Sequence, residues 1–455
     1  MRILWLCNIC PPAIASALGI SYSVREGWIT GALNSYLEGK AGEMELGICF
    51  PAEGELDGVP AASFQKIMRM RSWKEGKESR TVDDVSSKSE AGAAEKEVFV
   101  YGFAENLKTP EVYEPAMEQR FREILADFQP DLVHIFGTEF PHALAMERVF
   151  EKPGRTLVGL QGMVGECAKA YMADLSETVQ RRVTFRDIVR RDSMRQQQEK
   201  FYLRAKREKE VLESCSHVTG RTEFDRKASL ACNPQLQYHK MNETMRSVFY
   251  EGNWSLQNCN RYEIFISQGD YPLKGFHYLL EAMPEILKEF PDAHITVAGN
   301  SITGYATWKE KLKISGYGKY LRECMQKWNL SDKVKILGRL DADQMKAAFL
   351  NSHVFVCCSS VENSPNSLGE AMLLGVPCAA SRAGGLPDMA EDGVSALYFE
   401  KGNIRELADR ICCIFREDAL AEMLSREAAK RARITHNGEV NNSRLLEIYR
   451  EILNG

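Results

Sequence analysis

The stretch HVFVCCSSVENSPNSLGEAMLLG, residues 353–375, decides the fold of this chain. Its first part, His353 to Cys358, is an apolar run that predicts a buried strand, and the small and apolar residues from Ala371 onward predict a helix. Asn366 and Ser367 are polar residues of the kind that begin helices. A helix that starts at the end of a buried strand offers free N–H groups to a phosphate. The stretch therefore predicts one unit of a parallel α/β sheet with an anion site.

Two glutamates, Glu362 and Glu370, lie on either side of this helix start. Glu370 is three residues past Ser367, so the two side chains share a helix face. A carboxylate there can accept the two neighbouring hydroxyls of a ribose, and Glu362 in the preceding loop can reach the hydroxyls of a second sugar. The pair predicts a site for a nucleotide-sugar. The alternative interpretation is a capping box beside a surface glutamate.

Three further loops of the same half of the chain follow predicted strands. Lys274 follows the first of these strands, where a lysine can neutralise a phosphate as a point charge. Gly384 and Gly385 follow another strand, and two glycines let a backbone approach a sugar or a phosphate closely. Gly338 follows a third, where a nucleobase could stack on exposed backbone.

The length and composition limit the class of protein. A chain of 455 residues is too long for one core and predicts two or three domains. The net charge of -5 argues against a general nucleic-acid binder. No apolar run reaches the roughly 18 residues that span a bilayer, and the N-terminus lacks the pattern of a signal peptide. We therefore expect a cytoplasmic protein, with attachment to the inner face of the membrane as the alternative.

Strand and helix signals alternate along both halves of the chain, which indicates βαβ units and mostly parallel sheets. The sequence thus predicts an α/β protein with two doubly wound, Rossmann-like domains that face each other across a cleft. We expect an N-terminal domain at 1–245, a C-terminal domain at 246–435 and a final helix at 436–455 that packs back toward the N-terminal domain. Residues 232–262, which show little periodicity, are the predicted linker.

Two segments stand out from this alternation. Residues 72–97 are charged and small, which predicts a mobile surface loop, with a functional lid as the alternative. Residues 180–209 form a basic helical segment with interleaved apolar residues. The simplest interpretation is a long solvated helix with one face on the core. The alternative is a platform for anionic lipid headgroups.

Taken together and in this order, the motifs of residues 262–415 resemble glycosyltransferase family 4, the retaining GT-B enzymes that use nucleotide-sugars. The resemblance implies that Lys274 binds the diphosphate, that Glu362 is the catalytic glutamate near the donor sugar, and that Glu370 binds the ribose. Ser367 and Leu368 match the backbone phosphate donors of the family. The implied donor-binding set is Gly27, Lys274, Gly338, Asn366, Ser367, Leu368, Glu370, Gly384 and Gly385.

Two positions depart from the family pattern. Family members usually carry an arginine five residues before the lysine, and this chain has Gly269 there. The charge of the diphosphate must then be met by Lys274, by helix ends or by an arginine from elsewhere, for which Arg339 and Arg382 are the candidates. The family also often has a histidine where this chain has Gln161, on the acceptor side. Its role would fall to His142, or to a hydrogen bond from Gln161 to a sugar hydroxyl.

We expect no metal and no cofactor, because the nucleotide-sugar is itself a substrate. Asp341-Ala342-Asp343 spells the DxD that binds a metal in other glycosyltransferases, but it opens a predicted helix, where acidic residues are favourable in any case. Retaining transfer in this family also needs no dedicated protein base, since the leaving diphosphate can take the acceptor's proton.

The predicted function is that of a retaining, hexosyltransferase-type glycosyltransferase. It would move a sugar from a nucleotide-sugar to a saccharide or lipid-linked acceptor in bacterial cell-surface polysaccharide synthesis. Two alternatives stay open, a GT-B nucleotide-sugar epimerase and a non-catalytic sugar-binding homologue. The sequence does not identify the sugar, the nucleobase, the acceptor, the linkage or the oligomeric state.

Overall fold

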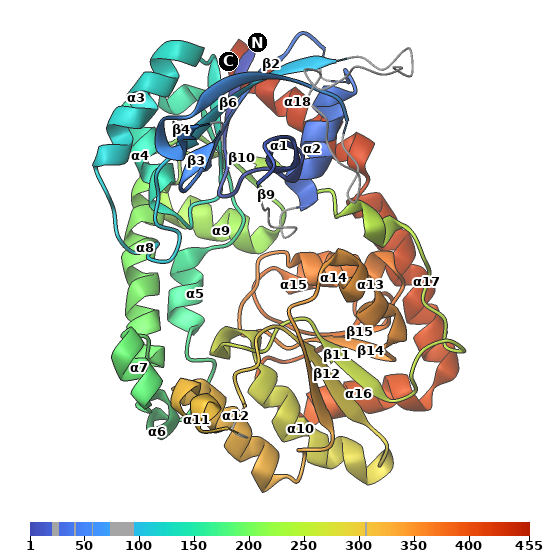
Figure 1. The fold of residues 1–455 in the computed structure, drawn as a ribbon. Coiled ribbons are helices and arrows are strands. Elements are labelled where there is room, and N and C mark those ends of the chain that lie inside the picture. The colour runs from blue at the N-terminus through green and yellow to red at the C-terminus, as the bar shows by residue number, and fades with distance from the viewer. Residues whose placement is uncertain (21–26, 41, 57, 73–94, 305–306) are drawn as a thin grey trace.

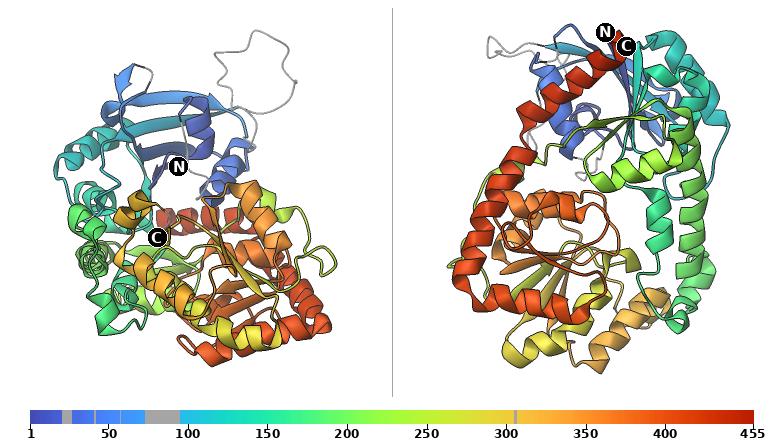
Figure 2. Two further views of the ribbon diagram at one scale, coloured as in Figure 1. Left: turned by 60° about the horizontal axis from the view of Figure 1, so that its bottom comes forward. Right: turned by 180° about the vertical axis from the view of Figure 1, so that it is seen from behind.

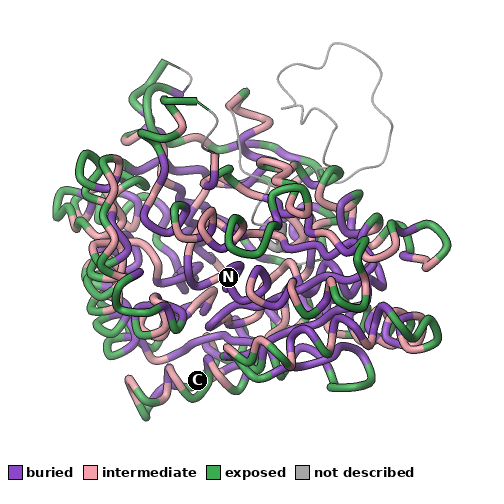
Figure 3. The backbone as a smooth tube through the Cα atoms, turned by 90° about the horizontal axis from the view of Figure 1, so that it is seen from below, coloured by how far each residue is buried: buried purple, intermediate pink, exposed green. Residues whose placement is uncertain are grey.

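The structure is a computed structural model that describes residues 1–20, 27–40, 42–56, 58–72, 95–304 and 307–455 (Figure 1). The predicted loop at 72–97 falls almost wholly outside these residues. Buried residues run through the centre of the molecule, and exposed ones lie on the outer helices and loops (Figure 3).

The N-terminal half is built on an eight-stranded sheet in the order β10-β9-β8-β7-β1-β2-β6-β5 (Figure 1). Neighbouring strands are parallel except for β5 and β6. The strand order reverses between β1 and β7, so ligands are expected at the carboxyl ends of these two strands. The strands are β1 (Arg2–Leu6), β2 (Glu45–Pro51), β5 (Gln65–Met70), β6 (Lys96–Phe103), β7 (Leu132–Phe136), β8 (Thr156–Gly159), β9 (His217–Gly220) and β10 (Gln237–Lys240), with a small hairpin of β3 (Glu55–Leu56) and β4 (Val59–Pro60).

Amphipathic helices cover this sheet. In α3, Met117, Phe121, Ile124 and Phe128 recur at helical spacing and are all buried, which is the pattern of a helix with one face on a core. The helices of this half are α1 (Pro12–Ala17), α2 (Gly27–Leu37), α3 (Ala116–Phe128), α4 (Pro141–Phe150), α5 (Val164–Ala170), α6 (Glu177–Gln180), α7 (Phe185–Arg190), α8 (Met194–Ser214) and α9 (Glu223–Cys232).

The C-terminal half is built on a six-stranded, all-parallel sheet in the order β13-β12-β11-β14-β15-β16. Its switch point lies between β11 and β14, and these strands are apolar and buried on both faces, as expected for a covered parallel sheet. The strands are β11 (Glu263–Ile266), β12 (His294–Ala298), β13 (Val334–Gly338), β14 (Val354–Cys357), β15 (Cys378–Ser381) and β16 (Leu397–Phe399). The helices are α10 (Phe276–Glu289), α11 (Trp308–Lys313), α12 (Gly316–Lys327), α13 (Ala342–Asn351), α14 (Asn366–Leu373), α15 (Leu386–Met389), α16 (Ile404–Arg416), α17 (Asp418–Thr435) and α18 (Gly438–Asn454).

The chain crosses between the halves more than once. The last helix, α18, returns to the N-terminal half, where Ile448 and Tyr449 join the core of the first sheet (Figure 2). The Tyr449 hydroxyl accepts a hydrogen bond from Trp5 Nε1 at 2.9 Å and lies 2.7 Å from His134 Nδ1. The two ends of the chain therefore lie close together at the same sheet.

The basic segment 180–209 is not the single long helix that its pattern predicts. It breaks into the end of α6, α7 and most of α8, because Thr184 and Ser193 each begin a new helix with a capping box. The segment also crosses halves, since Val179 and Met194 belong to the core of the C-terminal half. Helix α8 then runs back along one side of the molecule (Figure 1).

The predicted linker at 232–262 likewise contains regular structure. Its residues Gln237–Lys240 form β10, which pairs with β9 at the edge of the first sheet. A strand of this length shows too little alternation to be recognised from sequence.

Candidate active site

A cavity of about 930 Å³ opens between the two halves at the carboxyl ends of β11 and β14. Most of its lining comes from the loops that follow the strands of the C-terminal sheet, and the N-terminal half adds Gln161 and Arg221. Seven of the residues singled out in the sequence meet here: Gln161, Lys274, Arg339, Glu362, Asn366, Ser367 and Glu370.

Lys274 and Glu362 form an ion pair at the switch point of the C-terminal sheet. Lys274 follows β11, Glu362 follows β14, and the Lys274 Nζ lies 2.5 Å from Glu362 Oε1. The same oxygen accepts a hydrogen bond from Ser359 Oγ at 2.8 Å. Burial by itself lowers the pKa of Lys274, but the Glu362 carboxylate raises this pKa well above its usual range. The lysine is therefore a fixed positive charge at neutral pH.

Glu370 is held by an arginine that sequence reasoning missed. Arg246 Nε and Nη2 donate to the two carboxylate oxygens of Glu370, each at 2.8 Å, in a bidentate fork. Burial raises the pKa of Glu370, and the Arg246 guanidinium opposes that shift. Arg246 lies in the predicted linker, 124 residues from its partner, so no local pattern marks it.

The start of α14 provides unpaired N–H groups. Pro365 precedes the helix and cannot cap it with a side chain. Within the described parts of the chain, the N–H groups of Asn366 and Ser367 have no hydrogen-bond acceptor, whereas the N–H of Leu368 donates to Pro365 O at 3.0 Å. Because α14 points its N-terminus at the cavity, its dipole favours an anion there.

The predicted glycines support the cavity from behind. A Cβ at Gly384 would lie 2.0 Å from the carbonyl oxygen of Glu362, and one at Gly385 would lie 2.2 Å from that of Asn363. The Gly385 N–H also donates to Glu362 O at 2.9 Å. These glycines, and Gly338, are not among the described residues that line the cavity. Gly384 and Gly385 thus let the loop that carries Glu362 pack closely, a different reason for glycine from close approach to a ligand.

The family usually has an arginine at the position of Gly269, and its absence here has a steric explanation. A Cβ at Gly269 would lie 2.9 Å from the ring of Phe276, so a longer side chain there would displace that ring. Of the two expected substitutes, Arg339 lines the cavity and donates to Asn300 Oδ1 at 2.9 Å. Arg382 pairs instead with Asp392, and it is not among the described lining residues.

The wall from the N-terminal half is a polar network around Glu243. Gln161 Nε2 donates to Glu243 Oε1 at 2.8 Å, and Arg221 Nη1 donates to Glu243 Oε2 at 2.5 Å. Burial raises the pKa of Glu243, and Arg221 opposes this. Gln161 is therefore held in place by a buried carboxylate, and Arg221 is a second cavity arginine that sequence reasoning missed.

His142 lies inside the N-terminal half and is not part of the described cavity lining. It is fully buried, with Nδ1 2.6 Å from Glu105 Oε2 and Nε2 2.9 Å from Asn8 Oδ1. Asn8 follows β1, and its Nδ2 is 3.5 Å from the carboxylate of Glu139 after β7. His142 is thus linked through Asn8 to the switch point of the first sheet.

Two other predicted residues are placed as follows. Gly27 begins α2, and residues 21–26 before it lie outside the described residues. Asp341 caps α13, where it accepts from the Gln344 N–H at 2.8 Å.

Residues 255–431 match the family described as "Glycosyl transferases group 1". Curated relatives include the phosphatidyl-myo-inositol mannosyltransferase of Mycobacterium leprae (strain TN), 26% identical over 191 residues, which cover 42% of this chain and 46% of that protein. Another is the spore coat protein SA of Bacillus subtilis (strain 168), 26% identical over 181 residues, or 39% of this chain and 45% of the relative. The matched part of the chain spans about half the length of these relatives.

Solved structures resemble the whole chain. The sucrose-phosphate synthase from Thermosynechococcus elongatus superposes with a TM-score of 0.66 at 13% identity, over 100% of this chain and 99% of that one. Anabaena HepE in complex with UDP-glucose gives a TM-score of 0.62 at 15% identity, over 99% and 100%. The prediction of an α/β fold with two facing Rossmann-like sheets is confirmed.

Proposed function

Because residues 255–431 belong to the group 1 glycosyl transferases and the whole chain has the GT-B fold, we propose that this protein is a retaining glycosyltransferase that uses a nucleotide-sugar. One observation carries the proposal. The cavity between the halves gathers Lys274 and Arg246, Glu362 and Glu370, and a helix N-terminus at the switch point of the C-terminal sheet.

The donor's diphosphate would bind between Lys274, Arg246 and the free N–H groups of α14. Lys274 is a point charge, and Arg246 presents a planar fork that matches phosphate oxygens. These groups supply positive charge where the family pattern has an arginine and this chain has Gly269. We propose that the chain's own cations, and not a metal ion, meet the charge of the diphosphate.

The carboxylates would bind the two sugars of the donor. Glu370 lies in the first turns of α14 and would accept hydrogen bonds from the ribose hydroxyls while Arg246 holds its carboxylate. Glu362 would accept from hydroxyls of the transferred sugar while Ser359 and Lys274 orient it. Both carboxylates are thus fixed before the donor arrives, which lowers the entropic cost of binding.

The proposed reaction breaks the bond between C1 of the sugar and a diphosphate oxygen, and the electron pair stays on that oxygen. The acceptor hydroxyl oxygen bonds to C1 on the same face of the sugar, and its proton passes to the leaving diphosphate oxygen. The protein orients the reactants and stabilises the charge that grows on the diphosphate. Lys274 and Arg246 perform the second task.

We propose a saccharide or lipid-linked acceptor, in the synthesis of bacterial cell-surface polysaccharide. Support comes from the names of two relatives, a phosphatidyl-myo-inositol mannosyltransferase and a spore coat protein. The acceptor would enter from the side of the N-terminal half, near Gln161.

The test is nucleotide release from a panel of nucleotide-sugars, with and without saccharide and lipid acceptors. We expect one donor to release its nucleotide only when an acceptor is present, and the product to keep the anomeric configuration of the donor. Glu362→Gln should lower kcat by roughly 100-fold or more, as for loss of a preorganised polar group. Glu391→Gln, an exposed glutamate, is the matched control.

Three results would contradict the proposal. Turnover of the sugar without any acceptor would indicate an isomerase. An inverted product would exclude a retaining mechanism. Full loss of activity in EDTA, restored by a divalent cation, would show that a metal meets the diphosphate charge.

A further inference from the structure

Two short helices from different halves, α7 and α11, pack side by side at one end of the molecule (Figure 1). Large apolar side chains on and beside them are exposed to solvent. Their exposed fractions are 56% for Val183, 61% for Phe185, 66% for Ile188, 66% for Val189, 67% for Trp308 and 43% for Leu312. We refer to these six residues as the α7–α11 face.

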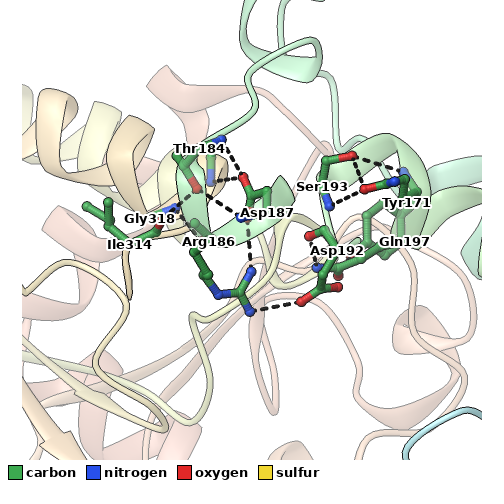
Figure 4. Close-up of polar contacts among 12 residues, drawn as sticks. Tyr171, Thr184, Arg186, Asp187, Asp192, Ser193, Gln197, Ile314 and Gly318 are labelled. Carbon is green, nitrogen blue, oxygen red and sulfur yellow. Dashed lines mark hydrogen bonds and ion pairs between the residues drawn. The ribbon is translucent and has the colours of Figure 1, made fainter. Parts of the chain in front are cut away.

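Two charged residues of helix α7, Arg186 and Asp187, form polar contacts with neighbouring residues instead of facing solvent alone (Figure 4). Asp187 is 1% exposed, and its Oδ2 accepts from the N–H groups of Thr184 and Gly316. Arg186 donates to Asp187 at 3.0 Å and to Asp192 at 2.9 Å. With these two charges bonded to neighbours, the helix leaves Phe185, Ile188 and Val189 exposed to solvent together with Arg190. A contiguous apolar surface of this kind usually marks an interaction site.

Unpaired basic residues surround the face. Within the described residues, Arg190, Arg191, Lys309 and Lys313 are exposed and form no ion pair. The acidic side chains nearby are already engaged: Asp192 with Arg186, Glu177 with Arg181 and Arg195, Glu323 with Arg182, and Glu310 with the N-cap of α11. The rim of the face therefore carries a local excess of positive charge.

We propose that the α7–α11 face docks this protein on an anionic lipid bilayer. Exposed aliphatic and indole side chains with a basic rim match the boundary between lipid headgroups and acyl chains. No helix among the described residues is both long enough and apolar enough to cross a bilayer. The proposal narrows the predicted lipid platform at 180–209 to α7, and adds α11, whose part the sequence did not indicate.

A second cavity connects this face to the candidate active site. It has a volume of about 460 Å³, and Arg190 and Lys313 belong to its lining. It shares Asp270, Asn300 and Arg339 with the larger cavity. The basic rim of the α7–α11 face therefore lines a cavity that adjoins the donor cavity. Membrane docking itself does not depend on the proposed sugar transfer.

The test is co-sedimentation with two kinds of vesicle, phosphatidylcholine alone and phosphatidylcholine mixed with phosphatidylglycerol, at low and high salt. We expect binding to the mixed vesicles only, weakened by salt because screening shortens the range of the attraction. Arg190→Glu with Arg191→Glu should weaken binding about 30-fold or more. Ile188→Ser with Val189→Ser should weaken it about tenfold.

The two control residues lie on α17, on the opposite side of the molecule from α7 (Figure 1). Ile434 is 70% exposed and Arg426 is exposed, so the double variant with Ile434→Ser and Arg426→Glu removes an apolar side chain and reverses a charge on another face. This control should bind like the unaltered protein, and all variants should keep its unfolding temperature, since the altered side chains are exposed.

Any of three results would overturn the proposal. The first is no binding to the mixed vesicles at low salt, and the second is equal binding to neutral ones. The third is unchanged binding in both α7 variants. Light scattering that shows a dimer split by Ile188→Ser would also overturn it, because a second copy of the chain would then cover this face.

Discussion

At the scale of single residues, the two glutamates of the candidate site each pair with a cation. Glu362 is paired with Lys274, and Glu370 with Arg246, and the four side chains are all at most 20% exposed. Removing one member of a buried pair leaves an uncompensated charge, so neither pair can be split without cost. The cations that would meet a diphosphate are therefore kept charged and oriented by the residues that would bind its sugars.

Replacing Arg246 by lysine tests the bidentate fork. Lysine keeps the charge but loses the planar pair of donors, so donor affinity should fall about tenfold, the equivalent of one charge-assisted hydrogen bond. Calorimetric titration with the donor measures this. Arg382→Lys is the control, because Arg382 is paired with Asp392 away from the cavity. Equal affinity in Arg246→Lys would show that Arg246 is not part of the clamp.

Glu147 should make stability depend on pH. Burial raises the pKa of its carboxyl to about 7 from an ordinary 4.5, although hydrogen bonds from Thr156 and Ser214 oppose the shift. The folded state thus keeps a proton that the unfolded state loses. Its contribution is complete below the unfolded pKa and is lost as the pH rises through the folded one.

The glutamine in Glu147→Gln cannot ionise, so this variant should lose the pH dependence of stability that Glu147 causes. Relative to the unaltered protein, the variant should gain about 3 kcal/mol of unfolding free energy between about pH 5 and about pH 8. Urea unfolding at both pH values measures the difference. A change in unfolding free energy that is the same at both would contradict the assignment.

At the scale of elements, local patterns were enough where an element's signal lies in its own sequence. β7 is a short, mostly apolar run, and α4 begins at Pro141, so both elements carry their signals in their own residues. The local sequence gives only a weak strand signal for β2, because Gly47 lies in its middle. A Cβ at Gly47 would touch Leu4 and Phe128. That glycine is explained only by a neighbouring strand and helix, which the local sequence does not show.

The residues of the candidate site also differ in whether the local sequence indicates them. Lys274, Glu362 and Ser367 each follow a predicted strand, and the carboxyl ends of parallel strands meet at one edge of the sheet, so the sequence predicts that they lie close together. Arg246 and Arg221 reach the cavity through partners 124 and 22 residues away, and no short pattern encodes such a contact. The roles of all these residues stay predictions until variants are measured.

Two glycines that follow β15, Gly384 and Gly393, test how the loop that carries Glu362 is held in place. Gly384→Ala places a Cβ 2.0 Å from Glu362 O at a φ of +58°, whereas Gly393→Ala, at +73°, meets open space. Both changes strain the backbone by about 1–2 kcal/mol. Only the first should push the loop that carries Glu362 and lower the transfer rate well beyond its effect on stability. Equal activity in the two variants would contradict this role of Gly384.

At the scale of the whole molecule, each half contains a piece of the other. Val179 and Met194 lie in the core of the C-terminal half, and Tyr449 lies in that of the N-terminal half. The chain therefore crosses between the halves on both sides of the molecule (Figure 2). Relative movement of the halves, which would open or close the cavity, must bend these crossings.

Buried histidines should make the whole molecule sensitive to acid. Burial lowers the pKa of His134 to about 3, and those of His277, His353 and His436 to about 4. The unfolded chain takes up protons near 6.5 that the folded chain refuses, so this stability is present above the unfolded pKa and is lost as the pH falls.

By about pH 5.5 the free energy of unfolding should have fallen by about 1 kcal/mol for each of these histidines. The four together exceed the opposite effect of Glu147 and Glu208, whose raised pKa values favour acid. The unfolding temperature, measured between neutral pH and about pH 5, should therefore fall on acidification. A rise over that range would show that the carboxylates dominate.

We propose above all that the cavity between the halves binds the diphosphate of a nucleotide-sugar through Lys274. The most direct test of this binding is calorimetric titration of the unaltered protein, of Lys274→Ala and of Lys288→Ala with a panel of nucleoside diphosphates. Lys288 is an exposed lysine of α10 and serves as the control. At least one nucleoside diphosphate should bind one to one, and Lys274→Ala alone should weaken its binding by about 100-fold, as expected when a buried charge pair loses one partner. Binding of none of them, or equal binding to Lys274→Ala, would contradict the proposal.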